Sequence, residues 1–285
     1  MALPILIYYI FLSAILCVLC ASAVKKGRLS MILEFSEKGI VFFPDPTLIG
    51  TPADVGLAYE EVWFTAADGV KLHGWWVPKK DAPVLLWFHG NGGNISHRLE
   101  NIELLLDQVG VSVFIFDYRE YGKSQGRISR EGTYLDAAAA YRYVVEDRKV
   151  PPPDLVLFGR SLGTALATDL AVKLPCRSLI LESAYTNSQD MARLYAPFLF
   201  DWRPSVPYDN LGKIGQVKAP VLIIHGEDDE IIPVDMGRRV FAAAPEPKEL
   251  YLIPMSHHND TYLVGGKTYF ERLRSFIFPQ GNQDL

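Results

Sequence analysis

The sequence predicts a single α/β domain, built on a mostly parallel sheet of eight strands with helices on both faces. Short, almost wholly apolar runs alternate with longer helix-like segments over most of the chain. Near-continuous apolar runs are typical of strands buried on both faces, as in parallel sheets. The chain has 285 residues, of which 49% are hydrophobic, which suits one domain with a large core.

The expected strands and helices follow one another in a regular order. Glu60–Thr65 and Val70–Val77 are expected to form a hairpin, because Asp68-Gly69 between them is a strong turn signal. Further strands are expected at Val84–Phe88, Val111–Phe116, Leu155–Phe158, Ser178–Leu181, Val221–Ile224 and Leu250–Ile253. Helices are expected near 98–108, 134–146, 162–173, 235–244 and 261–277. This alternation of strands and helices predicts a parallel sheet.

Two segments lie outside the alternation. Ser188–Leu211 is a longer insertion, rich in aromatic residues and proline, between two of the expected strands. It should lie as a short cap above the carboxyl edge of the sheet, where α/β sheets bind ligands. Residues 25–57 are expected to form a connector ahead of the folded domain at 58–285. Phe42-Phe43-Pro44 and two further prolines predict that it is extended.

Residues 1–24 predict a transmembrane anchor. Pro4–Val24 has no charged residue and is long enough to cross a bilayer, which takes about 20 apolar residues. Lys25, Lys26 and Arg28 follow at once, and the positive-inside rule places them, with the domain behind them, in the cytoplasm. The alternative is a signal segment cleaved after Ala21-Ser22-Ala23, with export of the domain. A buried helix is disfavoured, because the run is apolar all round.

Composition argues against several kinds of partner. The net charge is −5 and there is no Lys/Arg-rich stretch, so no nucleic-acid partner is expected. Only Cys176 lies beyond the N-terminal run, so no disulfide framework can be drawn in the domain. His89 and His97 have no carboxylate or cysteine at ligand spacing, and neither a metal nor another cofactor is expected.

The strongest chemical signal is Gly159-Arg160-Ser161-Leu162-Gly163, a G-x-S-x-G sequence. It follows an expected strand and opens an expected helix, which is the context that places a serine in a sharp, strained turn with its Oγ exposed. Small residues are needed there because the strand and the helix come close together. The helix N-terminus favours developing negative charge. Ser161 is therefore the predicted nucleophile; a chance match is the alternative.

A serine hydroxyl needs a base to take its proton and a carboxylate to orient that base. With this elbow, the chain order is serine, acid, histidine. The acid should follow the strand Val221–Ile224, where Asp229 is favoured among several acidic residues. Glu182, at the end of an earlier strand, is a less favoured acid. The base should follow the last strand, where His258 is favoured and His257 is its neighbour.

An oxyanion hole is expected from two main-chain amides. One is that of Leu162, directly after the nucleophile, and the other comes from the loop after Val84–Phe88. That loop reads His89-Gly90-Asn91-Gly92-Gly93-Asn94, and its glycines let amides approach a small anion. Asn91 is the predicted second donor.

Several phrases together resemble the small, N-terminally membrane-anchored serine hydrolases of the α/β-hydrolase superfamily. The phrases are Phe88-His89-Gly90-Asn91, Asn94-Ile95-Ser96-His97-Arg98, Phe116-Asp117-Tyr118-Arg119, Gly159-Arg160-Ser161-Leu162-Gly163, His225-Gly226-Glu227-Asp228-Asp229 and His258-Asn259-Asp260. The resemblance runs from about Phe35 to Phe278 and implies the α/β-hydrolase fold.

In that family's pattern the fifth residue of the His-Gly phrase is the acid, which falls on Asp229. The histidine before Asn-Asp is the base, which falls on His258. Two features depart from the pattern: Glu120 stands where the family usually has Gly, and Met255-Ser256-His257 replaces a more glycine-rich approach to the base. Some relatives of that group are depalmitoylating thioesterases.

The sequence thus predicts a serine hydrolase that cleaves a carboxylic ester or thioester through an acyl-enzyme. The aromatic insertion and the anchor favour a small-molecule or lipid-like substrate with an apolar acyl group. A peptidase or amidase with the same triad is the alternative enzyme. A non-catalytic binding protein on this fold is the alternative from another class, but such proteins commonly lose a triad residue.

Overall fold

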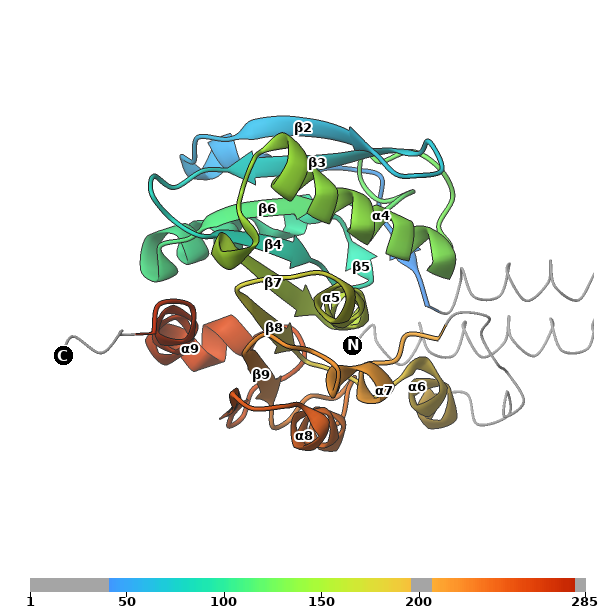
Figure 1. The fold of residues 1–285 in the computed structure, drawn as a ribbon, viewed down its shortest axis with the longest axis vertical. Coiled ribbons are helices and arrows are strands. Elements are labelled where there is room, and N and C mark those ends of the chain that lie inside the picture. The colour runs from blue at the N-terminus through green and yellow to red at the C-terminus, as the bar shows by residue number, and fades with distance from the viewer. Residues whose placement is uncertain (1–40, 196–206, 280–285) are drawn as a thin grey trace, which may run out of the picture.

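The computed structural model describes residues 41–195 and 207–279. Eight strands form one sheet in the order β10-β9-β8-β7-β4-β6-β3-β2, which Figure 1 shows from β2 at the top to β9 at the bottom. The strands are β2 (Glu60–Thr65), β3 (Lys71–Val77), β4 (Val84–Phe88), β6 (Ser112–Phe116), β7 (Leu155–Arg160), β8 (Ser178–Glu182), β9 (Val221–Gly226) and β10 (Lys248–Ile253). β3 is antiparallel to β2 and β6, and the other neighbouring pairs are parallel. The predicted fold class is confirmed.

The hairpin of β2 and β3 turns where the sequence predicts it. Gly69 has a φ of +85°, a conformation that glycine adopts without a steric penalty. The main-chain amide of Ala66 donates to the oxygen of Val70, and that of Gly69 to the oxygen of Ala66. The turn places β2 at the outer edge of the sheet.

Helices cover both faces of the sheet (Figure 1). They are α3 (Leu99–Leu104), α4 (Arg130–Arg142), α5 (Leu162–Lys173), α6 (Ser188–Tyr195), α7 (Leu211–Ile214), α8 (Val234–Ala243) and α9 (Thr261–Ile277). Single turns of 3₁₀ or π type lie at η1 (Pro52–Val55), η2 (Ile95–Arg98), η3 (Leu105–Val109), η4 (Tyr143–Asp147) and η5 (Pro152–Asp154). The expected helices at 162–173 and 261–277 have the bounds observed for α5 and α9. The helix expected near 98–108 is instead divided among η2, α3 and η3.

Alternate residues of the central strands point into two separate apolar layers. Leu86 and Phe88 of β4 belong to the layer that includes α4, α5 and α8. Leu85 and Trp87 belong to the opposite layer, with η3 and α9. Because both faces are covered, the inner strands are apolar at nearly every position, which is the pattern that revealed them in the sequence.

The described part of the expected connector, residues 41–57, packs against the domain. Phe42 is buried in the core at 2% exposure. β1 (Phe43–Pro44) pairs in parallel with β5 (Gly92–Gly93), directly after Asn91. Pro52 begins the turn η1 rather than continuing an extended chain, because Asp54 accepts a hydrogen bond from the amide of Thr51 at 2.7 Å.

The described parts of the insertion lie at the carboxyl edge of the sheet. The insertion follows β8 and precedes β9, and its ends are held together by an antiparallel bridge between Asn187 and Asp209. α6 opens the insertion. The hydroxyl of Tyr195, its last residue, donates to the main-chain oxygen of Ile231 at 2.6 Å, in the loop after β9.

The predicted anchor, Pro4–Val24, lies outside the described residues. None of the helices in residues 41–195 and 207–279 combines the length and the apolar character that crossing a bilayer requires.

Candidate active site

Ser161 lies in a strained turn between β7 and α5. Its φ of 51° and ψ of −117° are unfavourable for a residue with a side chain. The turn is held in place by the amide of Ser161, which donates to the oxygen of Glu182 at 2.9 Å. Only 9% of the residue is exposed.

The two glycines of the elbow are required by close main-chain contacts. A Cβ on Gly159 would lie 2.6 Å from the oxygen of Gly163, and one on Gly163 would overlap the oxygen of Phe88. Gly90, after β4, would carry its Cβ 3.5 Å from that of Ser161. The loop after β4 therefore lies directly against the serine.

The structure brings Ser161, His258 and Asp229 into one hydrogen-bonded chain. His258 Nε2 lies 3.1 Å from Ser161 Oγ, and His258 Nδ1 lies 2.8 Å from Asp229 Oδ2. An ionised Asp229 accepts from Nδ1–H, which leaves Nε2 free to accept from the serine hydroxyl. This is the geometry of a serine activated by a base that an acid orients.

The loop after β9 keeps Asp229 ionised. Burial of this carboxyl disfavours its charged form, but hydrogen bonds from His225 and His258 outweigh burial and hold its pKa well below its usual range. The amides of Ile231 and Ile232 also donate to its Oδ1, at 2.9 and 2.7 Å. His225 Nε2 lies 2.8 Å from the oxygen of Ile232 and 3.4 Å from Asp229 Oδ2. The sequence reasoning missed His225, although it directly precedes Gly226 in the phrase that contains the acid.

The neighbouring candidates point elsewhere. The His257 side chain is 58% exposed, and its Nδ1 lies 3.0 Å from the main-chain oxygen of Asp228. Glu230 accepts from the amide of His258 at 3.1 Å and does not reach its ring in a hydrogen bond. The structure therefore places His258 beside Ser161, and His257 at the surface.

Glu182, the less favoured acid, is occupied by other donors. Arg160 Nε donates to Glu182 Oε1 at 2.9 Å, and Thr261 Oγ1 donates to the same oxygen at 2.7 Å. Tyr269 donates its hydroxyl to Oε2 at 2.5 Å. These contacts tie Glu182 to α9 and to the residue before the nucleophile.

The predicted oxyanion donors lie on either side of Ser161. Leu162 is the first residue of α5, and Asn91 stands in the loop that contacts the serine through Gly90. Within the part of the chain that the structure describes, the main-chain amides of Asn91 and Leu162 have no hydrogen-bond partner. The side chain of Asn91 donates to the oxygen of Val41, two residues before β1, at 2.7 Å.

Two tyrosines that the sequence did not single out hold the loop after β4. Tyr118 donates to the oxygen of His89 at 2.9 Å, and Tyr121 donates to the oxygen of Asn91 at 2.7 Å. Both tyrosines are fully buried, and burial raises their pKa values well above 10. They remain neutral donors that orient these two carbonyl groups.

His89 has a structural role in the same loop. Burial lowers the pKa of His89 to about 3, so the ring is neutral, and its Nδ1 lies 2.6 Å from the oxygen of Gly90. Among residues 41–195 and 207–279, no three His, Cys, Asp or Glu side chains are grouped as metal ligands.

Several apolar side chains remain exposed in the loops of Asp229 and His258 and on α6. Met255, in the loop before His258, is 74% exposed, and Ile231, two residues after Asp229, is 37% exposed. Leu194 and Tyr195 of α6 are 47% and 48% exposed. All four come from segments that follow the carboxyl ends of β8, β9 and β10. This edge can therefore contact an apolar group.

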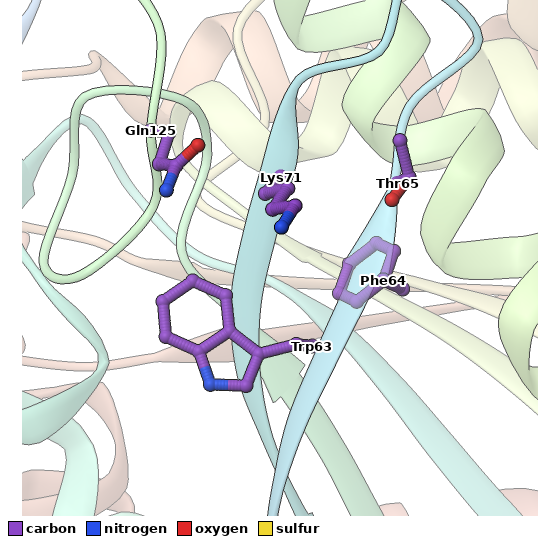
Figure 2. Close-up of a pocket in the computed structure, with 5 residues that line it drawn as sticks. All are labelled: Trp63, Phe64, Thr65, Lys71 and Gln125. Carbon is purple, nitrogen blue, oxygen red and sulfur yellow. The ribbon is translucent and has the colours of Figure 1, made fainter.

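A separate hollow lies on the outer strands of the sheet. Figure 2 shows its lining, to which β2 contributes Trp63, Phe64 and Thr65, β3 contributes Lys71, and a loop contributes Gln125. No residue of the Ser161 chain lines it, so it is distinct from the candidate active site.

Comparisons with known proteins agree with this architecture. Residues 83–212 match the family model of the α/β-hydrolase fold. An uncharacterised protein of Mycobacterium tuberculosis is 34% identical over 87% of this chain and 89% of its own length. The α/β-hydrolase domain-containing protein WAV2 of Arabidopsis thaliana is 32% identical, with the same two coverages.

A solved structure shows the same fold. The Pyrococcus furiosus esterase Pf2001 superposes with a TM-score of 0.70 and 22% identity, over 82% of this chain and 98% of that one. The elbow, the sheet order and the relatives of similar length lead to one conclusion: the chain belongs to the α/β-hydrolase family.

Proposed function

We propose that this protein is a serine hydrolase that cleaves a carboxylic ester or thioester with an apolar acyl group. The observation that carries the proposal is the hydrogen-bonded chain from Ser161 Oγ through His258 to Asp229, at a strained elbow. All three groups of the triad are present, which disfavours a purely binding role for the fold.

The first half of the reaction transfers the acyl group to the enzyme. Ser161 Oγ attacks the carbonyl carbon while its proton passes to His258 Nε2. Asp229 stabilises the imidazolium that forms. The amides of Asn91 and Leu162 donate to the oxyanion of the tetrahedral intermediate. When the intermediate collapses, the carbon–oxygen or carbon–sulfur bond breaks, and the leaving alcohol or thiol takes the proton from His258.

The second half restores the serine. Water attacks the acyl-serine carbonyl and gives a proton to His258 Nε2. The second tetrahedral intermediate collapses to the free acid, and Ser161 Oγ takes the proton back. This half uses the same donors and the same base.

The apolar acyl group is supported by the exposed Ile231 and Met255, in the loops of Asp229 and His258, and by the exposed Tyr195, which contacts the oxygen of Ile231. Burial of apolar surface contributes about 25 cal/mol per Å², so a longer acyl chain that contacts these residues binds more tightly. The related fold of an esterase also favours ester chemistry.

The test is a series of p-nitrophenyl esters and acyl thioesters of increasing chain length, with a peptide p-nitroanilide as the amide probe. The proposal expects kcat/KM to rise with acyl length for the esters or thioesters, and the p-nitroanilide to be hydrolysed far more slowly. Ser161→Ala, which fits the same turn, should lower each rate by about 10³-fold or more. Faster cleavage of the anilide would favour the peptidase alternative.

A further inference from the structure

A buried ion pair joins the nucleophile strand to its neighbour behind the triad. Arg160 is the last residue of β7 and Glu182 the last of β8, and they are register partners in the sheet. Arg160 is 6% exposed and Glu182 is fully buried. A buried charge is tolerated when it is paired and hydrogen-bonded. Arg160 Nε donates to Glu182 Oε1 at 2.9 Å, so this pair meets both conditions.

The other arm of the guanidinium reaches the histidine loop. Arg160 Nη2 donates to the main-chain oxygen of His258 at 2.6 Å and to Asn259 Oδ1 at 3.1 Å. A guanidinium is planar and its donors point in fixed directions. The bond from Nε to Glu182 therefore fixes the direction in which Nη2 points, towards the His258 oxygen. One side chain therefore links the residue before Ser161 to the peptide of the base.

The carboxylate of this pair is itself fixed from the opposite side. Thr261 and Tyr269, both on α9, donate to its two oxygens at 2.7 and 2.5 Å. α9 follows the histidine loop directly. The loop from His258 to Thr261 is therefore anchored at both ends. Arg160 binds the oxygen of His258 at its start, and Glu182 binds Thr261 at its end.

We propose that Arg160 is a positioning residue for His258, and that Glu182 orients Arg160. The contact with the His258 oxygen keeps Nε2 within hydrogen-bond reach of Ser161 while the proton moves between the serine and the leaving group. Arg160 acts through the main chain of the base and does not touch the substrate. A displacement of about 1 Å in a catalytic group can lower a rate by about 10²-fold. This inference rests on the proposed function of the triad.

The first test is Arg160→Lys, assayed with p-nitrophenyl acetate after the active sites are titrated with a fluorophosphonate. A lysine ammonium cannot form the fork, so kcat per titrated site should fall about 10-fold to 100-fold while KM changes less than about threefold. A purely structural role would lower the titrated fraction or Tm and leave kcat per titrated site unchanged, which would overturn the proposal.

The matched control is Arg177→Lys. Arg177 also donates to main-chain oxygens, those of Ile277 at 2.9 Å and Pro153 at 3.1 Å, but it precedes β8 and so lies at the opposite edge of the sheet. We expect its kcat per titrated site to match the wild type. A loss equal to that of Arg160→Lys would show a general effect of arginine removal and would count against the proposal.

A second variant keeps the test decisive if Arg160→Lys folds poorly. R160M/E182Q removes both buried charges, and the amide at position 182 can still accept from Thr261 Oγ1 and donate to the Tyr269 hydroxyl, so the double variant should remain folded. The proposal expects this double variant to lose kcat by at least about 10-fold. Wild-type kcat in the folded double variant would refute a positioning role. Failure of the proposed function would give a different result, because Ser161→Ala would then remain active.

Discussion

At the scale of single residues, two positions that depart from the family's glycine-rich pattern have a backbone conformation that favours glycine. Glu120 and Met255 have φ values of +69° and +60°, a region that glycine enters without a steric penalty. These are the two sites where the sequence departs from a glycine-rich pattern. Glu120 gains a hydrogen bond in return, because its Oε2 accepts from the amide of Ile128 at 2.8 Å.

The elbow glycine at 163 tolerates no side chain. Gly163→Ala should lower the free energy of unfolding by about 3 kcal/mol, because its Cβ would overlap the Phe88 oxygen and push β4 away from α5. Gly215→Ala is the control, since its φ is −63° and its Cβ would stand 3.4 Å from the Ala243 oxygen. Urea unfolding measures both. If both variants lost the same small free energy of unfolding, the backbone at the elbow would accommodate a Cβ, which would contradict this prediction.

The depressed pKa of Asp229 predicts a pH dependence of stability. A carboxyl whose folded-state pKa is lowered adds stability above its unfolded pKa, and that contribution is lost as the pH falls towards the folded pKa. Below the ordinary aspartate value of 3.8, the wild-type free energy of unfolding should fall more steeply than that of Asp229→Asn, by about 1.4 kcal/mol per pH unit. Unfolding curves on both sides of 3.8 test this, and parallel slopes would contradict it.

At the scale of elements, the loop after β4 depends on a second loop for its shape. The carbonyls of His89 and Asn91 are held by the hydroxyls of Tyr118 and Tyr121, from the segment after β6. Because β4 and β6 are parallel neighbours, both segments leave the same edge of the sheet. The loop that contains Asn91, one of the two predicted oxyanion donors, is thus oriented by the loop of an adjacent strand.

Tyr121→Phe should lower kcat by about fivefold to tenfold. Loss of this bond leaves the Asn91 oxygen with one donor, the amide of Phe43 at 3.1 Å, and so loosens that peptide. One hydrogen bond is worth about 1 kcal/mol. Tyr141→Phe is the control, because its hydroxyl also donates to a main-chain oxygen, that of Pro175 at 2.6 Å, but from α4. Equal effects on kcat would remove the special role of Tyr121.

The elements were predictable from sequence where burial on both faces imposes a local pattern. Val84–Phe88 and the helix at 162–173 have the bounds that the sequence predicts, because apolar runs and the glycines of the elbow mark them locally. The turn at Ser161, between β7 and α5, was predictable for the same reason. Asp229 and His258 were favoured over their neighbours from their place after the strands, and a family resemblance strengthened the choice, since side-chain direction in a loop is not encoded in local spacing.

Long-range contacts account for what the sequence did not predict. The pairing of Arg160 with Glu182 depends on the register of β7 against β8, and the roles of Tyr118 and Tyr121 depend on which loops become neighbours. Each of these features is set by tertiary packing and not by periodicity.

At the scale of the whole molecule, the candidate triad, the loop after β4 and the described start of the chain lie together at the carboxyl edge of the sheet. The oxygen of Val41 accepts from the side chain of Asn91, and β1 pairs with the segment that follows Asn91. The N-terminal segment therefore joins the domain beside the candidate active site.

We propose that Pro4–Val24 remains attached as a membrane anchor and that the domain faces the cytoplasm. The uncharged run is long enough to span a bilayer, and its flanking positive cluster at Lys25, Lys26 and Arg28 opposes translocation. N-terminal sequencing of the native protein from the membrane fraction should find an intact N-terminus. A mature chain that begins at Val24 would instead show signal cleavage and export.

The central claim is that Ser161 is a nucleophile activated by His258. Its most direct test is the intact mass and peptide map of the full-length protein after treatment with a fluorophosphonate, for the wild type, His258→Ala and His257→Ala. The account predicts one adduct per chain on Ser161, formed at similar rates in the wild type and His257→Ala and at least about 10²-fold more slowly in His258→Ala. No adduct on Ser161 in the folded wild type, or rapid labelling of Ser161 in His258→Ala, would contradict it.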